Sequence, residues 1–326
     1  MSPRKRLLLT WISALALLIM ACGGIGFVVP PTPTLAPTWT ALPLPSPTEP
    51  FDLAQDKPAT VAPTSSPTET PTVPPSETPL PSFTPTLTAY LRGPDEVTIP
   101  ILLYHHIGVS LQGETVYYVS PDAFDHQMNL LYQWGYRTIS VELLAKAIRE
   151  GAELPPKPVI LTFDDGSETI YTTALLIMQK YGFTGTAYII YNYMWIPSYM
   201  DADQIRALYA AGWEIGSHGL SHTDLPSHPG RQKSEIVESR RKLQALLDLP
   251  ILSFSYPFGT YDRDSLYYVH YAGYIAAMGL GDETMQGQKN LFYLYRQPVK
   301  GTDGLLSFAA LLPWQGDLEP ALTLVP

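Results

Sequence analysis

The chain alternates short apolar runs with stretches of helical spacing from about Gly93 to its end, and this alternation constrains its fold more than any other feature. The run Pro158–Phe163 has the composition of a strand buried on both faces. Ser120 is a candidate N-cap for a helix that begins at Pro121. Alternating strands and helices predict a parallel sheet of the α/β class. Enough units are present to close a distorted (β/α) barrel, with an open doubly wound sheet as the alternative.

The expected elements can be given by residue range. We expect strands at 99–104, 137–140, 158–163, 185–190, 213–216, 252–256 and 274–278. We expect helices at 121–134, 141–149, 168–181, 201–211, 234–247 and 263–272. In a barrel of this kind the functional side chains lie at the carboxyl ends of the strands.

Residues 1–22 have the pattern of a bacterial lipoprotein signal peptide. A basic start, Arg4-Lys5-Arg6, precedes the apolar run Leu7–Met20, which is shorter than the about twenty residues needed to span a bilayer. The run ends in Ile19-Met20-Ala21-Cys22-Gly23, which resembles the lipobox, and Cys22 is the only cysteine. We therefore expect Cys22 to be lipidated and to anchor an extracytoplasmic bacterial protein to the cell membrane. An uncleaved membrane helix is the alternative.

Residues 23–92 are dominated by Pro, Thr and Ser. Proline fixes φ and lacks the backbone N–H, so such a stretch favours extended conformers and builds neither helix nor sheet. We expect a disordered linker that separates a membrane anchor from the globular part. The remaining residues, 93–326, form the predicted globular domain.

The charge of the chain excludes one class of partner. The 326 residues include 20 Lys and Arg against 30 Asp and Glu, for a formal net charge of −10. Nucleic-acid binding requires clustered basic residues that displace counterions from phosphates. We therefore expect no nucleic-acid partner.

Candidate functional residues follow four of the expected strands. Asp164 and Asp165 follow the strand at 158–163, His218 follows the strand at 213–216, and His105 follows the first strand. The segment Pro257-Phe258-Gly259 follows the strand at 252–256. The carboxyl ends of these strands share one face of a barrel, so we expect these residues to lie close together.

The histidines and the aspartate pair suggest a metal site. One aspartate with His218 and His222 would leave coordination positions open for water and substrate, as in catalytic zinc sites. Taken alone, Asp164-Asp165-Gly166 could be only a turn, and the two histidines could be a hydrogen-bonded pair on one helical face. Their occurrence together favours a metal-dependent hydrolase.

Thr162-Phe163-Asp164-Asp165-Gly166 together with His218-x-x-x-His222 resembles the polysaccharide deacetylases, the NodB-homology domain of carbohydrate esterase family four. The resemblance spans about 100–312 and implies that 93–326 is a deacetylase domain with the distorted barrel of that family. It implies that Asp165, His218 and His222 hold a divalent metal ion, usually Zn2+. It also implies that Asp164 is the general base.

The general acid of that family is a histidine in a Leu-x-His motif on the last strand. Here the motif is Leu103-Tyr104-His105 on the first strand. First and last strands are neighbours in a closed barrel, so this order resembles the circularly permuted branch that includes deacetylases of poly-β-1,6-N-acetylglucosamine. The resemblance implies that His105 is the acid, with His106 as the alternative.

The segment Ser255-Tyr256-Pro257-Phe258-Gly259 departs from the Arg-x-Pro pattern of the family, because Ser255 stands in place of the arginine. That arginine tunes the catalytic aspartate, and we expect Arg296 to act in its place, although a surface position for Arg296 is the alternative. The resemblance implies that the backbone amide of Phe258 contributes to an oxyanion hole.

Three functions remain open. The resemblance favours N-deacetylation of N-acetylglucosamine units in a cell-surface polysaccharide. The alternatives are an O-acetyl esterase acting on xylan or another glycan, and an inactive surface protein that binds carbohydrate. Four aromatic residues near one strand could either stack on sugar rings or belong to the core: Tyr188, Tyr191, Tyr193 and Trp195.

Overall fold

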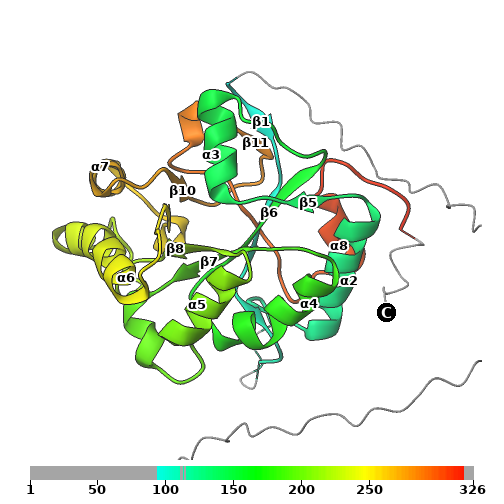
Figure 1. Cartoon of the computed structure of the whole chain (residues 1–326), viewed down its shortest axis with the longest axis horizontal. Coiled ribbons are helices and arrows are strands. Elements are labelled where there is room, and N and C mark those ends of the chain that lie inside the picture. The colour runs from blue at the N-terminus through cyan, green and yellow to red at the C-terminus, as the bar shows by residue number, and fades with distance from the viewer. Residues whose placement is uncertain (1–93, 111–112, 114, 319–326) are drawn as a thin grey trace, which may run out of the picture. The chain divides into compact units, whose positions relative to one another are not determined.

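The computed structural model describes residues 94–110, 113 and 115–318. The expected signal peptide, the lipidated Cys22 and the linker at 23–92 lie outside these residues. Within them, helices surround a central parallel sheet (Figure 1). None of the helices in the described ranges is both long and apolar enough to cross a membrane.

Eight strands of the described chain form the central sheet, in the order β10-β9-β8-β7-β6-β2-β12, with β5 paired to β6. All of its pairings are parallel. The strands are β2 (Ile101–Tyr104), β5 (Arg137–Thr138), β6 (Pro158–Phe163), β7 (Thr186–Ile189), β8 (Glu214–Ser217), β9 (Ser253–Ser255), β10 (Ala276–Met278) and β12 (Gln297–Pro298).

The sheet closes on itself through the stretch 294–298. Leu294 pairs with β10, because its N–H donates to Ala277 O and its carbonyl accepts from Gly279 N, at 2.8 and 2.9 Å. A few residues on, β12 pairs with β2. One stretch thus joins the two edge strands, which confirms the expected distorted barrel. It also confirms that the first strand, β2, neighbours the last.

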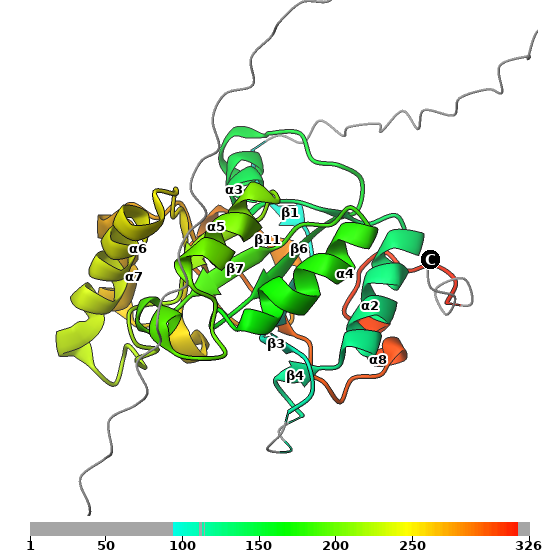
Figure 2. The same ribbon diagram turned by 60° about the horizontal axis from the view of Figure 1, so that its bottom comes forward.

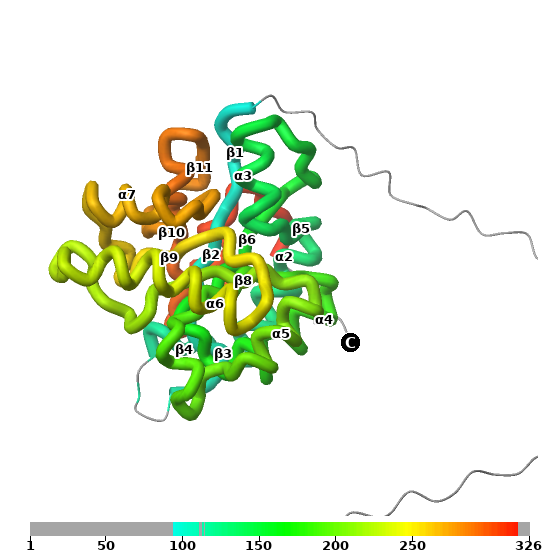
Figure 3. The backbone as a smooth tube through the Cα atoms, turned by 60° about the vertical axis from the view of Figure 1, so that its left-hand side comes forward, coloured from blue at the N-terminus to red at the C-terminus, as the bar shows by residue number. Residues whose placement is uncertain are grey.

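Two short sheets lie at opposite ends of the barrel (Figure 2, Figure 3). The antiparallel pair β1 (Val97–Thr98) and β11 (Met285–Gln286) lies at the end where the barrel strands begin. The parallel pair β3 (His106–Ile107) and β4 (Tyr118–Val119) lies where they end. Because β3 directly follows β2, this pair borders the face on which the functional residues were expected.

The helices follow the expected ranges closely. Ser120 caps the first of them as predicted, since its hydroxyl accepts the Ala123 N–H at 3.2 Å. The expected helices at 168–181 and 234–247 each contain a π-helical turn, at Ile170–Ala174 and Ser234–Glu238. The α-helices are α2 (Pro121–Gln133), α3 (Val141–Glu150), α4 (Leu175–Lys180), α5 (Ala202–Ala210), α6 (Ser239–Leu247), α7 (Arg263–Ala272) and α8 (Leu305–Ala310).

The pleat of the strands decides which residues face the barrel interior. Successive side chains of a strand point to opposite faces. In β6, Leu161 and Phe163 pack in the large cluster beneath the helices, whereas Ile160 belongs to the second cluster, which fills the barrel. Thr162 and Asp164 follow Ile160 at intervals of two residues, so they face the same side. Asp164 therefore faces the barrel interior at the end of the strand. The same alternation turns Tyr104 toward the helices and His105 toward the interior.

The chain beyond Met278 departs from the regular alternation that we expected to continue to the end. It contains the two-residue strands β11 and β12, and the short helix α8. Strands of two residues carry no periodicity that a sequence pattern can reveal. This irregular part closes the barrel and supplies one residue of the site.

Candidate active site

A cavity of about 540 Å³ opens where the strands end. Residues from the ends of β2, β6, β8 and β9 reach it, as the strand-end rule predicts. The structure thereby brings together the residues that the sequence singled out. Its lining includes His105, His106, Asp164, Asp165, His218, His222, Phe258 and Arg296.

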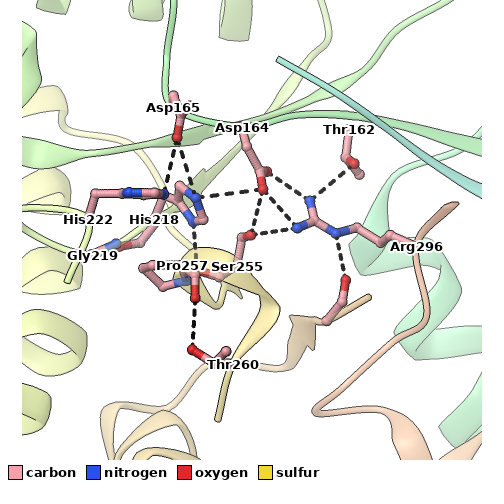
Figure 4. Close-up of polar contacts among 12 residues, drawn as sticks. Thr162, Asp164, Asp165, His218, Gly219, His222, Ser255, Pro257, Thr260 and Arg296 are labelled. Carbon is pink, nitrogen blue, oxygen red and sulfur yellow. Dashed lines mark hydrogen bonds and ion pairs between the residues drawn. The ribbon is translucent and has the colours of Figure 1, made fainter. Parts of the chain in front are cut away.

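Arg296 and Asp164 form a buried, two-pronged ion pair (Figure 4). Arg296 Nη1 donates to Asp164 Oδ1 and Nη2 donates to Asp164 Oδ2, both at 2.8 Å. The remaining guanidinium N–H groups reach Gly279 O, Thr162 Oγ1 and Ser255 Oγ. Arg296 is only 1% exposed, so the alternative of a surface arginine is wrong.

This ion pair determines the charge of Asp164. Burial by itself would raise the pKa of the Asp164 carboxyl, but the charge and hydrogen bonds of Arg296 outweigh burial and hold the pKa well below its usual range. Ser255 lies between the two partners, donating to Asp164 Oδ2 at 3.1 Å while accepting from Arg296. Ser255 therefore leaves room for an arginine that arrives from another part of the chain.

Asp165, His218 and His222 form a compact set of ligand atoms. One donor atom of each lies within 4.8 Å of the others, and this is the one such group of metal-ligating side chains in the ranges that the structure describes. Asp165 Oδ1 lies 3.6 Å from His218 Nε2 and 3.5 Å from His222 Nε2. The two motifs expected to share an ion are thus adjacent in space.

The chemistry of these three groups fits a cation. Asp165 Oδ1 is buried without a hydrogen-bond partner among the described residues. Burial, and then the charge of Asp164, raises the pKa of Asp165 to about 7. A carboxyl in this position needs positive charge nearby to stay ionised at neutral pH. A divalent ion between Asp165 and the imidazoles would give Asp165 Oδ1 a partner and supply the positive charge that keeps the carboxyl ionised.

His218 is oriented for ligation by the backbone. Its Nδ1 lies 2.8 Å from Ser255 O, and a carbonyl oxygen only accepts, so Nδ1 carries the hydrogen. The lone pair is then on Nε2, which faces the aspartates. Burial lowers the pKa of His218 to about 4, which keeps the ring neutral, the form that binds metals.

Three non-glycine residues at this site have positive φ, a backbone conformation that such residues rarely adopt. Asp165, His222 and Phe258 have φ values of 71°, 55° and 60°. Left-handed conformations cost free energy for residues other than glycine, and they persist only where surrounding contacts enforce them. The alternative of a histidine pair on one helical face is wrong, because 218–222 forms a turn rather than a helix.

His105 lies in the cavity under the influence of Asp164. Burial lowers the pKa of His105 to about 4, while the negative charge of Asp164 acts in the opposite direction. His105 packs edge-on against Tyr117, and His106 stacks on Tyr118 with ring centroids 4.3 Å apart. The charge of Asp164 thus partly offsets the effect of burial on His105, which the sequence predicts to be the proton carrier.

The aromatic residues around the cavity differ from those singled out in the sequence. Tyr188 is buried inside the barrel, where its hydroxyl contacts Ser253 Oγ, so Tyr188 belongs to the core. Trp195 is exposed, but it borders a separate small pocket. The cavity is instead lined by Tyr117, Tyr118, Tyr256 and Phe258. The Phe258 ring packs against His222 at 4.4 Å.

Sequence reasoning missed Glu235, which lies beneath the turn that carries the two histidines. Its carboxylate is 1% exposed and accepts hydrogen bonds from the backbone of Leu220 and Ser221. In the sequence Glu235 is an ordinary polar residue at the start of a predicted helix. No motif signal distinguishes it, because its role depends on contacts made in the folded chain.

The chain is similar to known polysaccharide deacetylases. Residues 151–277 match the family model described as polysaccharide deacetylase. The chain is 25% identical over 215 residues to YxkH of Bacillus subtilis (strain 168), covering 65% of this chain and 75% of that protein. It is 24% identical over 195 residues to the poly-beta-1,6-N-acetyl-D-glucosamine N-deacetylase of Staphylococcus aureus, covering 55% and 67%. The solved structure of the deacetylase PplD from Streptococcus pyogenes, in complex with acetate, aligns with a TM-score of 0.61 and 26% identity, covering 66% of this chain and 98% of PplD.

A hydrolase is indicated by the barrel, by the carboxylate and imidazole groups where its strands end, and by these similarities. Residues 151–277 carry a polysaccharide deacetylase domain, as the resemblance of the motifs predicted. It is related to the poly-β-1,6-N-acetylglucosamine N-deacetylases.

Proposed function

We propose that this chain removes acetyl groups from N-acetylglucosamine units of a cell-surface polysaccharide, with a divalent ion, Zn2+ by the resemblance, held by Asp165, His218 and His222. The proposal is carried by one observation: two adjacent carboxylates in one cavity have different surroundings. Asp164 is kept ionised by Arg296, whereas Asp165 faces two imidazoles. Metal-assisted amide hydrolysis uses a proton acceptor beside a bound metal ion.

The choice of an amide substrate is supported by kinship and by the position of His105. The relatives include an N-deacetylase of a β-1,6-linked N-acetylglucosamine polymer. His105 directly follows β2, the neighbour of the last strand, where the resemblance implies a general acid. An amine is a poor leaving group unless it is protonated, so an acid at this place suits an amide more than an ester.

The residues of the chain divide the proton transfers between them. When bound, the ion supplies positive charge that polarises the acetyl carbonyl and lowers the pKa of water. Asp164 accepts the proton that the attacking water loses. The backbone amide of Phe258 donates to the carbonyl oxygen as it becomes negative. His105, once it has been protonated, gives that proton to the nitrogen as the C–N bond breaks, so that the products are acetate and a free amino group.

Acetate release tests the proposal. The protein is incubated with a β-1,6-linked N-acetylglucosamine oligomer, acetylated xylan and chitin oligomers, with Zn2+ or with a chelator. We expect release from the N-acetylglucosamine substrates, loss of that release in chelator, and recovery when Zn2+ is restored. Release from acetylated xylan alone would favour the esterase alternative, and activity that is unaffected by chelation would contradict the metal site.

The expected cellular setting gives a separate prediction. We propose that Cys22 carries the lipid that holds the chain at the outer face of the cell membrane. Cys22→Ser should move the protein from the membrane fraction to the soluble extracytoplasmic fraction and abolish labelling by a radioactive fatty acid. A Cys22→Ser protein that still takes up the label would contradict the assignment.

A further inference from the structure

Residues 218–223, here called the histidine loop, connect the two histidines of the site through an unusual backbone path. Gly219 has φ of 85° and His222 has φ of 55°. A loop in such conformations needs contacts from outside to hold one geometry. The structure shows two sets of such contacts, one on the carbonyl groups of the loop and one on its N–H groups.

The carbonyl groups bind a neighbouring segment. Gly219 O accepts from Tyr191 N at 3.1 Å and Leu220 O accepts from Asn192 N at 2.9 Å. These are backbone contacts, and they use only one side of the loop. The opposite side of the loop faces Glu235.

Glu235 gathers the donors of the histidine loop on one buried carboxylate. Oε2 accepts from Leu220 N at 2.8 Å and from Ser221 N at 2.9 Å. Oε1 accepts from Ser221 Oγ at 2.6 Å and from Thr223 Oγ1 at 3.1 Å. Arg231 adds a guanidinium contact to Oε1 at 3.0 Å. A buried charge is costly unless it is paired and hydrogen-bonded, so this arrangement persists because every contact is made.

The close approach of Glu235 also explains a glycine in the loop. A Cβ on residue 219 would lie 3.1 Å from Glu235 Oε2, in addition to the strain of its positive φ. The loop and the carboxylate therefore fit each other closely. Glu235 does not line the cavity, so its hydrogen bonds act on the site through the loop, while its charge also acts on His222.

We propose that Glu235 is a positioning residue, which sets the separation and orientation of His218 and His222 so that they bind one ion together with Asp165. This inference rests on the proposed function. Metal ligands held by such outer contacts bind typically 10- to 100-fold more tightly than the same ligands without them. The hydrogen bonds of Glu235 are made to backbone and hydroxyl groups of the loop rather than to an imidazole ring.

Zn2+ affinity of the full chain tests the inference. Glu235→Gln keeps one side-chain oxygen and replaces the other with an NH2 group. That group cannot accept the hydrogen bonds that the loop donates to the lost oxygen. We expect the Zn2+ dissociation constant, measured by competition with a chromophoric chelator, to rise about 10- to 100-fold. The absorption spectrum of the Co2+-loaded variant should change as well, because the ligand geometry changes. Thermal unfolding of the metal-free protein measures any general loss of stability separately.

Glu238→Gln is the matched control. Glu238 lies in the same helical segment, but it is half exposed and pairs with Arg241 at 2.7 Å, so its loss should leave Zn2+ affinity unchanged. If Glu235→Gln does not fold, Thr223→Val removes one donor and should weaken Zn2+ binding in the same direction. An unchanged affinity in the folded variant would overturn the positioning role alone. A parent chain that binds no Zn2+ would overturn both this inference and the proposed metal site.

Discussion

Replacing Asp164 with asparagine should lower kcat/KM for acetate release by about 10²- to 10⁴-fold, the usual contribution of a positioned acid or base. The asparagine keeps the size of the side chain, but it cannot take a proton from water at neutral pH. Asp164 lies 3.6 Å from His218 Nε2 without being part of the three-ligand cluster, so Zn2+ should remain bound. Initial rates and metal content, measured on the same sample, test both statements.

The adjacent aspartate supplies the control for this experiment. Asp165→Asn should also lose activity, but through weaker Zn2+ binding, because Asp165 belongs to the ligand cluster. The two variants are changed at neighbouring positions, and only Asp165→Asn should lose metal. Parental activity in Asp164→Asn would show that Asp164 is not the base, and loss of Zn2+ from it would show that Asp164 is a ligand.

Replacing Arg296 with methionine should lower the free energy of unfolding at pH 7 by about 3–5 kcal/mol, the usual cost of removing one partner of a buried ion pair. Asp164 would then be a buried carboxylate without a cation beside it. The variant also loses the guanidinium contacts to Gly279 O and Ser255 Oγ. Urea unfolding of both proteins measures the difference, and acetate release should fall in parallel.

The stability gap between these two proteins should depend on pH. In the parent, Arg296 lowers the pKa of Asp164, so the pair stabilises the fold above the unfolded pKa of about 3.9, and this contribution fades as the pH falls below it. In Arg296→Met, burial raises the pKa of Asp164, so the variant regains stability when acid protonates the carboxyl. The gap should therefore begin to narrow above pH 4, as the Asp164 carboxyl of the variant is protonated, and narrow further below pH 4, as the parent loses the contribution of the ion pair.

A double variant separates the pair from its surroundings. Asp164→Asn combined with Arg296→Met removes both charges, so its loss of stability should be smaller than the sum of the two single losses. Strictly additive losses would mean that the two side chains do not interact in solution. A gap that stays constant from pH 7 to pH 3 would likewise contradict the charge argument.

Much of the barrel could be predicted because its information is local. The apolar run Pro158–Phe163 and the cap at Ser120 each depend on neighbouring residues alone, and the structure confirms them. The convergence of Asp164, Asp165 and His218 follows from the general rule that strand ends share one face. Local pattern and a topological rule together were sufficient to locate the cavity.

Other features depend on contacts between distant parts of the chain. The partner of Asp164 comes from position 296, beyond the last strand with a recognisable pattern, and only the missing arginine at Ser255 pointed toward it. Glu235 carries no signal at all, because its donors are backbone groups of a loop. Tyr188 was ambiguous for a different reason, since aromatic side chains suit a sugar surface and a barrel core equally well.

Because residues 294–298 close the barrel, the site cannot form until this late part of the chain has been synthesised. A ribosome finishes β6, with Asp164 at its end, long before it reaches the segment that neutralises that carboxylate. Until Arg296 emerges and inserts between β10 and β2, the nascent polypeptide holds an uncompensated negative charge in a half-built interior. A product that ends before residue 296 would therefore lack both the partner of Asp164 and the stretch that closes the barrel.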